Sequence, residues 1–198
     1  MGIKVITPPT GEPVTQLVCE RHLERDGAYD SPPATQPDAE LIAGMLSAAR
    51  EHAEQFTSLS LAPQTLELAL DRFPSNEIEL TNGPVHSITS VTYIDADGNV
   101  QTVDELDYVL DDYSDSFWLL PADGFTWPST QSFVNAVKIR YVAGYSLPDD
   151  SPQPFPLPKS IRSALLVALK KFYDFRDTSD FPEGAYNLLR PHRKHIGV

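Results

Sequence analysis

The chain has 198 residues, of which 15 are lysine or arginine and 28 are aspartate or glutamate, so its formal net charge is −13. This length can bury a substantial core, and a hydrophobic content of 41% excludes a wholly disordered chain. The acidic balance argues against a nucleic-acid binder held by phosphate contacts, and the single cysteine, Cys19, excludes an internal disulfide and a multi-cysteine zinc site.

The N-terminal part is predicted to be extended at first and then helical. Three prolines exclude a helix in the first 14 residues, and a short helix is predicted from Thr15 to Asp26. A proline-rich loop from Gly27 to Pro37 precedes a longer helix from Asp38 to Ser58, whose start carries Thr35 and Asp38 at capping-box spacing. The apolar residues of this helix recur on one face: Leu41, Ile42, Met45, Leu46, Ala49, Ala53 and Phe56.

The pattern changes from helical periodicity to strict alternation in the middle of the chain. Asp95 to Gly98 forms a hairpin signal between two runs rich in β-branched residues. The alternation predicts an antiparallel sheet or a small barrel-like module. Its seven short strands are predicted at residues 66–70, 78–80, 85–94, 99–103, 108–110, 117–120 and 137–143.

Helical periodicity returns after a linker, residues 146–158, that holds five prolines. A long helix is predicted from Pro158 to about Asp177, and a short one from Ala185 to Leu189. Neither end of the chain can bury its apolar stripe alone, so the two ends are expected to pack together. The predicted fold class is α+β, a small helical bundle with an inserted antiparallel β module, divided as 1–62, 63–148 and 149–198. In the bundle, Ile161, Leu165, Leu169 and Phe172 are expected to pack on Leu41, Met45, Ala49 and Phe56.

A search for catalytic or metal-binding patterns finds little. Cys19 has one nearby base, His22, and is expected to be a small buried hydrophobe; His192 and His195 lack a third ligand nearby. Asp95 starts a turn without the glycine and glutamate spacing of a calcium-binding loop. We therefore expect no catalytic residue, no metal and no cofactor. Two alternatives stay open: a carboxylate-based hydrolase, and a monomeric ligand- or sugar-binding β module that uses Tyr93, Tyr108, Trp118, Trp127 and Tyr141.

Charge is distributed unevenly along the sequence. No lysine or arginine occurs between Arg72 and Lys138, whereas that interval holds eleven acidic residues. The acidic stretch is either a solvated surface or one that repels DNA or binds a basic partner. The residues singled out for that surface are Asp104, Glu105, Asp107, Asp111, Asp112 and Asp115.

The C-terminal tail has the opposite character, since basic residues follow an apolar pair. It is either a solvated terminus or an arm that binds a partner. As an arm it would use its apolar residues for affinity, and removal of residues 186–198 is expected to leave the fold intact. The residues assigned to this arm are Tyr186, Leu188, Leu189, Arg190, Arg193 and Lys194.

Blocks along nearly the whole chain resemble the adaptor proteins of tailed-phage head–tail connectors. The block from Val85 to Gly98 is the most similar, and Trp127-Pro128, residues 136–145 and the helix after Pro158 follow in family order. The tail at residues 188–191 also fits, as do the starts of the first two helices. The chain departs from the family in a longer loop at residues 27–37 and in lacking a glycine after the second helix.

This resemblance implies a structural role without catalysis. Such adaptors form a ring, usually twelve-fold, between the portal and the next neck or tail-completion protein. They extend a channel through which DNA passes without specific binding. The resemblance therefore implies self-association, the portal and a further neck or tail protein as partners, and no membrane. It also implies a location in the neck of the virion, and in the host cytoplasm during assembly.

Overall fold

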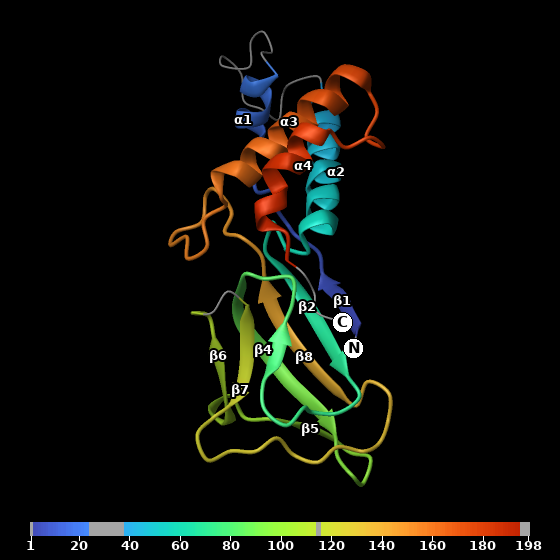
Figure 1. Cartoon of the computed structure of the whole chain (residues 1–198), viewed down its shortest axis with the longest axis vertical. Coiled ribbons are helices and arrows are strands. Elements are labelled where there is room, and N and C mark those ends of the chain that lie inside the picture. Colours follow the sequence, from blue (N-terminus) through green and yellow to red (C-terminus); the bar gives the residue numbers. More distant parts are fainter. Residues whose placement is uncertain (1, 24–37, 114–115, 195–198) are drawn as a thin grey trace. The chain divides into compact units, whose positions relative to one another are not determined.

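The computed structural model describes residues 2–23, 38–113 and 116–194, and its chain divides into two compact units. One unit, Met1–Thr10 with Pro63–Gly144, contains the strands, and the other, Gly11–Ala62 with Tyr145–Val198, contains the α-helices (Figure 1). The predicted fold class is confirmed: an antiparallel β module is inserted between helical segments that belong to one bundle.

The β unit consists of two antiparallel sheets. The larger has the strand order β1-β2-β8-β4-β5, and the smaller has the order β3-β7-β6. The strands of the larger sheet are β1 (Gly2–Thr7), β2 (Gln64–Leu70), β8 (Val137–Ala143), β4 (Val85–Ile94) and β5 (Val100–Thr102). Those of the smaller sheet are β3 (Ile78–Leu80), β7 (Phe117–Pro121) and β6 (Tyr108–Asp111), and the 3-10 helix η2 (Glu105–Asp107) precedes β6.

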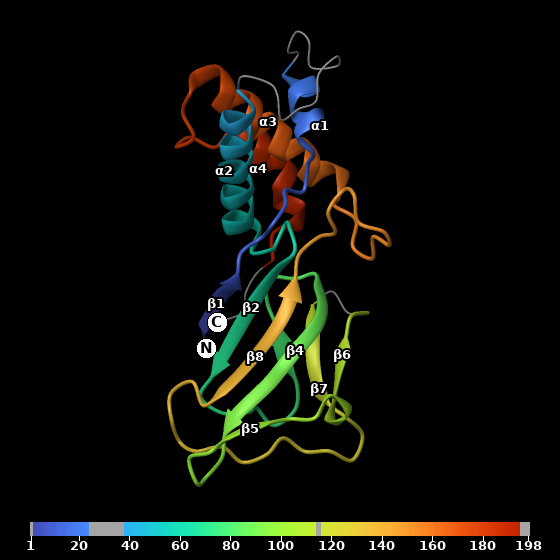
Figure 2. The same ribbon diagram turned by 180° about the vertical axis from the view of Figure 1, so that it is seen from behind.

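The two sheets share one hydrophobic core. Leu68 and Ile139 of the larger sheet are fully buried in the same cluster as Leu119 of the smaller sheet. Along each strand, a residue that points into the core is followed by one that points to the opposite face, so each sheet turns one face toward the shared core. The unit is therefore a two-layer sandwich, and each sheet keeps one outer face (Figures 1 and 2).

Strand β1 is a difference from the expectation, which placed residues 1–10 with the helical part. Gly2–Thr7 pairs antiparallel with β2, with Lys4 opposite Glu67 and Val5 opposite Leu66. All six residues of β1 are exposed, so the strand carries no alternation of burial. The prolines that follow mark the segment as non-helical, but its pairing is a long-range contact that no local pattern encodes.

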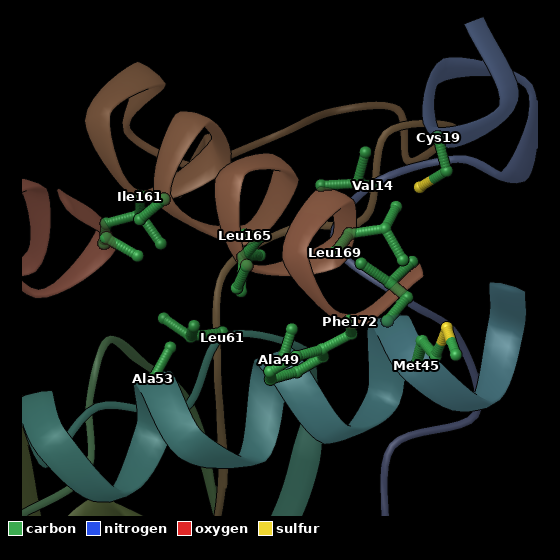
Figure 3. Packing of buried hydrophobic residues seen from close by; sticks show 14 of the residues in the cluster. Val14, Cys19, Met45, Ala49, Ala53, Leu61, Ile161, Leu165, Leu169 and Phe172 are labelled. Atoms are coloured by element: carbon green, nitrogen blue, oxygen red, sulfur yellow. The ribbon is translucent and has the colours of Figure 1, made fainter. Parts of the chain in front are cut away.

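The helical unit is built around α2 (Ala39–Thr57) and α3 (Lys159–Phe175), joined by α1 (Gln16–His22), α4 (Glu183–Leu189) and the 3-10 helix η3 (Arg190–His192). The expected contact between the apolar faces of α2 and α3 is confirmed: Leu165 and Phe172 belong to one buried cluster with Met45 and Ala49 (Figure 3). Leu41 is the exception, because it is 40% exposed and lies outside that cluster.

Two of the helix ends lack the residues that usually cap a helix. Ser58 caps α2 in the left-handed conformation, φ 56°, which is where the family pattern predicts a glycine. Pro158 precedes α3 as its N-cap and therefore lies just outside its first turn. Thr15 occupies the N-cap of α1 as predicted. The predicted loop at Gly27–Pro37, with Thr35, and the last residues predicted for the first helix lie outside the described residues.

Candidate interaction surfaces

The candidate nucleophile is enclosed in the helical core. Cys19 is fully buried, and this burial raises the pKa of its thiol to about 12, with Glu12 and Glu20 adding to the effect. A raised pKa favours the protonated thiol at neutral pH, which is the less nucleophilic form. Two carboxylates of the same unit have partners. Glu20 Oε1 accepts a hydrogen bond from Gln16 at 3.0 Å, whereas its buried Oε2 has no hydrogen-bond partner among the described residues, and Glu54 pairs with Arg50 at 2.9 Å.

The candidate metal ligands have other roles in the structure. His192 Nε2 lies 2.6 Å from Ser160 Oγ, and burial lowers the pKa of this histidine; His195 is outside the described residues. Asp95 accepts the backbone N–H groups of Asp97 and Asn99 at 3.0 and 2.9 Å, so its carboxylate closes the hairpin turn. Within residues 2–23, 38–113 and 116–194, no group of three or more histidine, cysteine or acidic side chains could hold a metal ion.

Four of the five aromatic residues of the sugar-binding alternative belong to the β core or pack against it, and Trp118 is the exception. Tyr141 is fully buried and donates a hydrogen bond to Thr81 O at 2.9 Å. Trp127 stacks on Phe73 with 4.9 Å between ring centroids, and Phe73 also contacts Tyr93. A sugar platform needs such rings open to solvent, so these contacts favour a packing role.

The acidic surface predicted from the sequence is centred on η2 and β6. Asp104 caps η2, because its side chain accepts a hydrogen bond from the backbone N–H of Leu106 at 3.0 Å. The side chain of Asp111 accepts a hydrogen bond from the backbone N–H of Tyr113 at 3.0 Å. Glu105 and Asp112 are exposed, and Asp107 is half-buried in η2. Asp115 lies outside the described residues.

Large apolar side chains are exposed beside these carboxylates, which the sequence did not reveal. Leu106 is 82% exposed, Val109 is 55% exposed and Tyr113 is 99% exposed. They lie before, within and after β6, which is an edge strand of the smaller sheet. Exposed apolar residues grouped in this way are typical of a contact surface rather than of a wall that only repels DNA.

The apolar part of the predicted C-terminal arm is instead part of the helical core. Leu189 has no exposed surface, Leu188 packs partly buried on the same cluster, and the ring of Tyr186 lies 4.8 Å from that of Phe56. Their helix, α4, packs on α3 and α2, so these side chains are satisfied within the chain. The expectation that removing residues 186–198 leaves the fold intact is therefore corrected, because the deletion would open this core.

The basic part of the arm is exposed, but it also contacts the chain. Arg190 pairs with Glu183 at 2.8 Å. The Arg193 guanidinium lies 5.2 Å from the centre of the Phe56 ring, and Lys194 N donates to Thr57 O, the last carbonyl of α2, at 2.9 Å. The segment from Arg190 to Lys194 thus lies along the C-terminal end of α2.

None of the helices within the described residues is long and apolar enough to cross a membrane.

Comparison with known proteins supports the resemblance at the level of fold. The chain is similar over its whole length to a chain from the neck of an empty gene transfer agent particle computed with C6 symmetry. The TM-score is 0.77 at 19% identity, and the alignment covers 100% of this chain and 98% of the other. A chain from the virion of a native gene transfer agent particle aligns with TM-score 0.75 at 20% identity, with the same coverage of both chains.

A third similar chain comes from the neck of the native particle computed with C12 symmetry, with TM-score 0.68 at 19% identity and again 100% and 98% coverage. No protein-family model matches the sequence, and no curated protein matches it. At this level of identity the comparisons show a shared fold, which includes the inserted β unit because both chains are covered almost completely.

Proposed function

We propose that this chain is a structural protein of the neck of a tailed-phage-like particle, an adaptor between the portal and the tail or the next neck component. The observation that carries the proposal is the fold match over 100% of this chain and 98% of a chain from a particle neck, at TM-score 0.77. Fold alone does not imply function, but a match that includes an inserted module is more restrictive than a match to a common superfold.

The proposed adaptor forms a closed ring that extends the DNA channel. Two of the similar chains belong to necks computed with sixfold and twelvefold symmetry, which supports a ring for this chain too. The chemistry of the described residues is consistent with a structural role, since the Cys19 thiol is buried and Glu54 is paired with Arg50. No specific observation favours the hydrolase or the sugar-binding alternative.

A deletion in a strain that produces the particles tests this function. Without the chain, DNA-filled heads should form but should lack tails, and a plasmid copy of the gene should restore tailed particles. Electron microscopy of purified particles measures both outcomes, and a tagged chain should be located at the junction of head and tail. Normal tail attachment in the deletion strain would contradict the proposal.

The basic C-terminal segment is proposed to orient the adaptor on the portal or on the neighbouring subunit. The double substitution Arg193→Glu and Lys194→Glu should reduce tail attachment, and the loss should depend on ionic strength because exposed charge pairs are screened. The fraction of tailed heads measures the effect at low and at physiological salt.

The control for this segment is Lys159→Glu with Arg162→Glu, exposed positions at the start of α3 that change the net charge equally. Acidic residues at a helix start are tolerated or stabilising, so this variant should stay folded. Equal loss of attachment in both variants would show that only net charge matters, and the segment would have no orienting role.

A further inference from the structure

The outer face of the larger sheet gathers most of the basic side chains of the β unit. This unit has four basic and 13 acidic residues in its sequence. Lys4 lies opposite Glu67, which in turn lies opposite Arg140, and Lys138 lies on the same face two residues before Arg140. Because Leu68 and Ile139 point into the core, these side chains share the outer face, and Arg72 is the one basic residue of the unit not among them.

This basic face is also hollowed. A pocket of about 270 Å³ is lined by outer-face residues of β8, β4 and β2, among them Lys138, Arg140 and Thr92, and by Val100 at its rim, which is 74% exposed. Its lining of cationic, polar and apolar groups also includes Glu67, which pairs with Arg140 at 2.6 Å. Lys138 in the lining and Lys4 on the same face are therefore the cations left for an incoming carboxylate that accompanies an apolar side chain.

The outer face of the smaller sheet has the opposite character. Trp118 lies opposite both Glu79 and Asp111, and Leu120 lies opposite Val109. Since Leu119 between them is buried, these residues point away from the core. Exposed Leu106 and Tyr113 and the carboxylates Glu105 and Asp112 lie just beyond the two ends of β6, so an apolar surface is bordered by negative charge.

We propose that these two faces bind each other between neighbouring copies of the chain, the smaller sheet of one copy packing on the larger sheet of the next. The two faces lie on opposite sides of one sandwich, so the contact is heterologous, and repetition of a heterologous contact closes into a ring when the rotation permits. The inference rests on the proposed function, for which it identifies the surfaces that join the subunits.

The second copy is the occupant that the charges favour. The apolar residues of the smaller sheet supply contact area, whereas the opposed charges set the orientation and rate of association. DNA is disfavoured because the exposed apolar residues lie among carboxylates. A basic protein of another kind is an outcome that the test below distinguishes.

Charge reversal of each face tests the contact in purified protein. One variant carries Glu105→Lys and Asp112→Lys, and the other carries Lys4→Glu and Lys138→Glu; none of these side chains caps a turn. Sedimentation equilibrium up to millimolar protein should show self-association of the wild type and at least about tenfold weaker self-association of each variant. An equimolar mixture of the two variants should regain association, since each reversed face meets its complement on the other variant.

The control matched to the Glu105→Lys and Asp112→Lys variant is Asp97→Lys with Asp123→Lys, which makes the same change of charge in the same unit at exposed turn positions and should associate like the wild type. Circular dichroism and the midpoint of thermal unfolding verify the fold of each variant. A wild type that stays monomeric, a variant mixture that stays monomeric, or variants that associate as strongly as the wild type would each overturn the inference. Tail attachment in particles is scored separately, so a chain located in the neck whose association ignores these charges refutes only the inference.

Discussion

Truncation of Leu165 to alanine should lower the free energy of unfolding of the helical unit by about 2–5 kcal/mol. Leu165 is fully buried in the centre of α3 and points toward α2, where the facing residues include Ala49 and Ala53 (Figure 3). Alanines have no side chain that can extend into the cavity left by the substitution, so little of the lost contact is recovered. Chemical denaturation followed by the far-ultraviolet helix signal measures the change.

Val167→Ala is the control, because Val167 lies on the same helix but is 38% exposed. Alanine has a higher helix propensity than valine, which offsets the small loss of burial, so the change should stay within about 0.5 kcal/mol. If Leu165→Ala lowered the free energy of unfolding as little as this control, the packing of α3 on α2 described above would be contradicted.

The parts of the fold that were predictable from sequence are those with strong local periodicity. The spacing of Met45 and Ala49 identified the buried face of α2, and the alternation through Leu66 and Leu68 identified β2. The extended conformation of the first residues was predicted, but their pairing as strand β1 was not predictable, because an edge strand exposed on both faces has no burial pattern and is defined only by its partner. Leu41 falls on the predicted stripe but lies at its margin, where solvent reaches it.

The interaction surfaces were less predictable than the fold. A run of carboxylates is visible in sequence, so the acidic residues near β6 were found. The basic face was missed, because Lys4 and Arg140 are 136 positions apart and meet only through their pairing with β2. The apolar pair Leu188-Leu189 was assigned to a partner because a seven-residue helix gives too few positions to separate a core face from a binding face.

Arg50 was also missed, although it forms the most enclosed ionic cluster described in the helical unit. Its side chain is 8% exposed and contacts Glu12 at 3.0 Å and Glu54 at 2.9 Å, and it donates a hydrogen bond to Ser47 Oγ at 3.1 Å. The side chain of Glu54 in turn accepts a hydrogen bond from the backbone N–H of Leu61 at 2.7 Å. The cluster therefore fixes α2 to the segment before α1 and to the segment that leads to β2.

Replacement of Arg50 by alanine should cost about 3–5 kcal/mol of unfolding free energy, because it leaves Glu54 buried without its cation. Arg190→Ala is the matched control: Arg190 also pairs with a glutamate, Glu183, at 2.8 Å, but both side chains are more than 60% exposed. An exposed pair contributes about 0–1 kcal/mol, so the control should be nearly neutral. Similar losses of unfolding free energy in both variants would show that the enclosed cluster stabilises the fold no more than an exposed ion pair does.

The pH dependence of the Arg50→Ala variant separates this electrostatic cause from simple loss of packing. Burial raises the pKa of Glu54 above its ordinary 4.5, whereas Leu61 N–H and Arg50 lower it, so removing Arg50 should raise this pKa further. A group with a raised pKa in the folded state stabilises below its unfolded pKa and loses that contribution as pH rises through the folded value. The deficit relative to the wild type should therefore be larger near about pH 8 than near about pH 5. The double variant Arg50→Met with Glu54→Gln should recover part of the loss at high pH, since the amide oxygen still accepts a hydrogen bond from Leu61 N–H and the charge of Glu54 is removed, whereas half-buried Glu12 still lacks its cation. A deficit that is independent of pH and is not relieved by the double variant would assign the effect of Arg50 to packing alone.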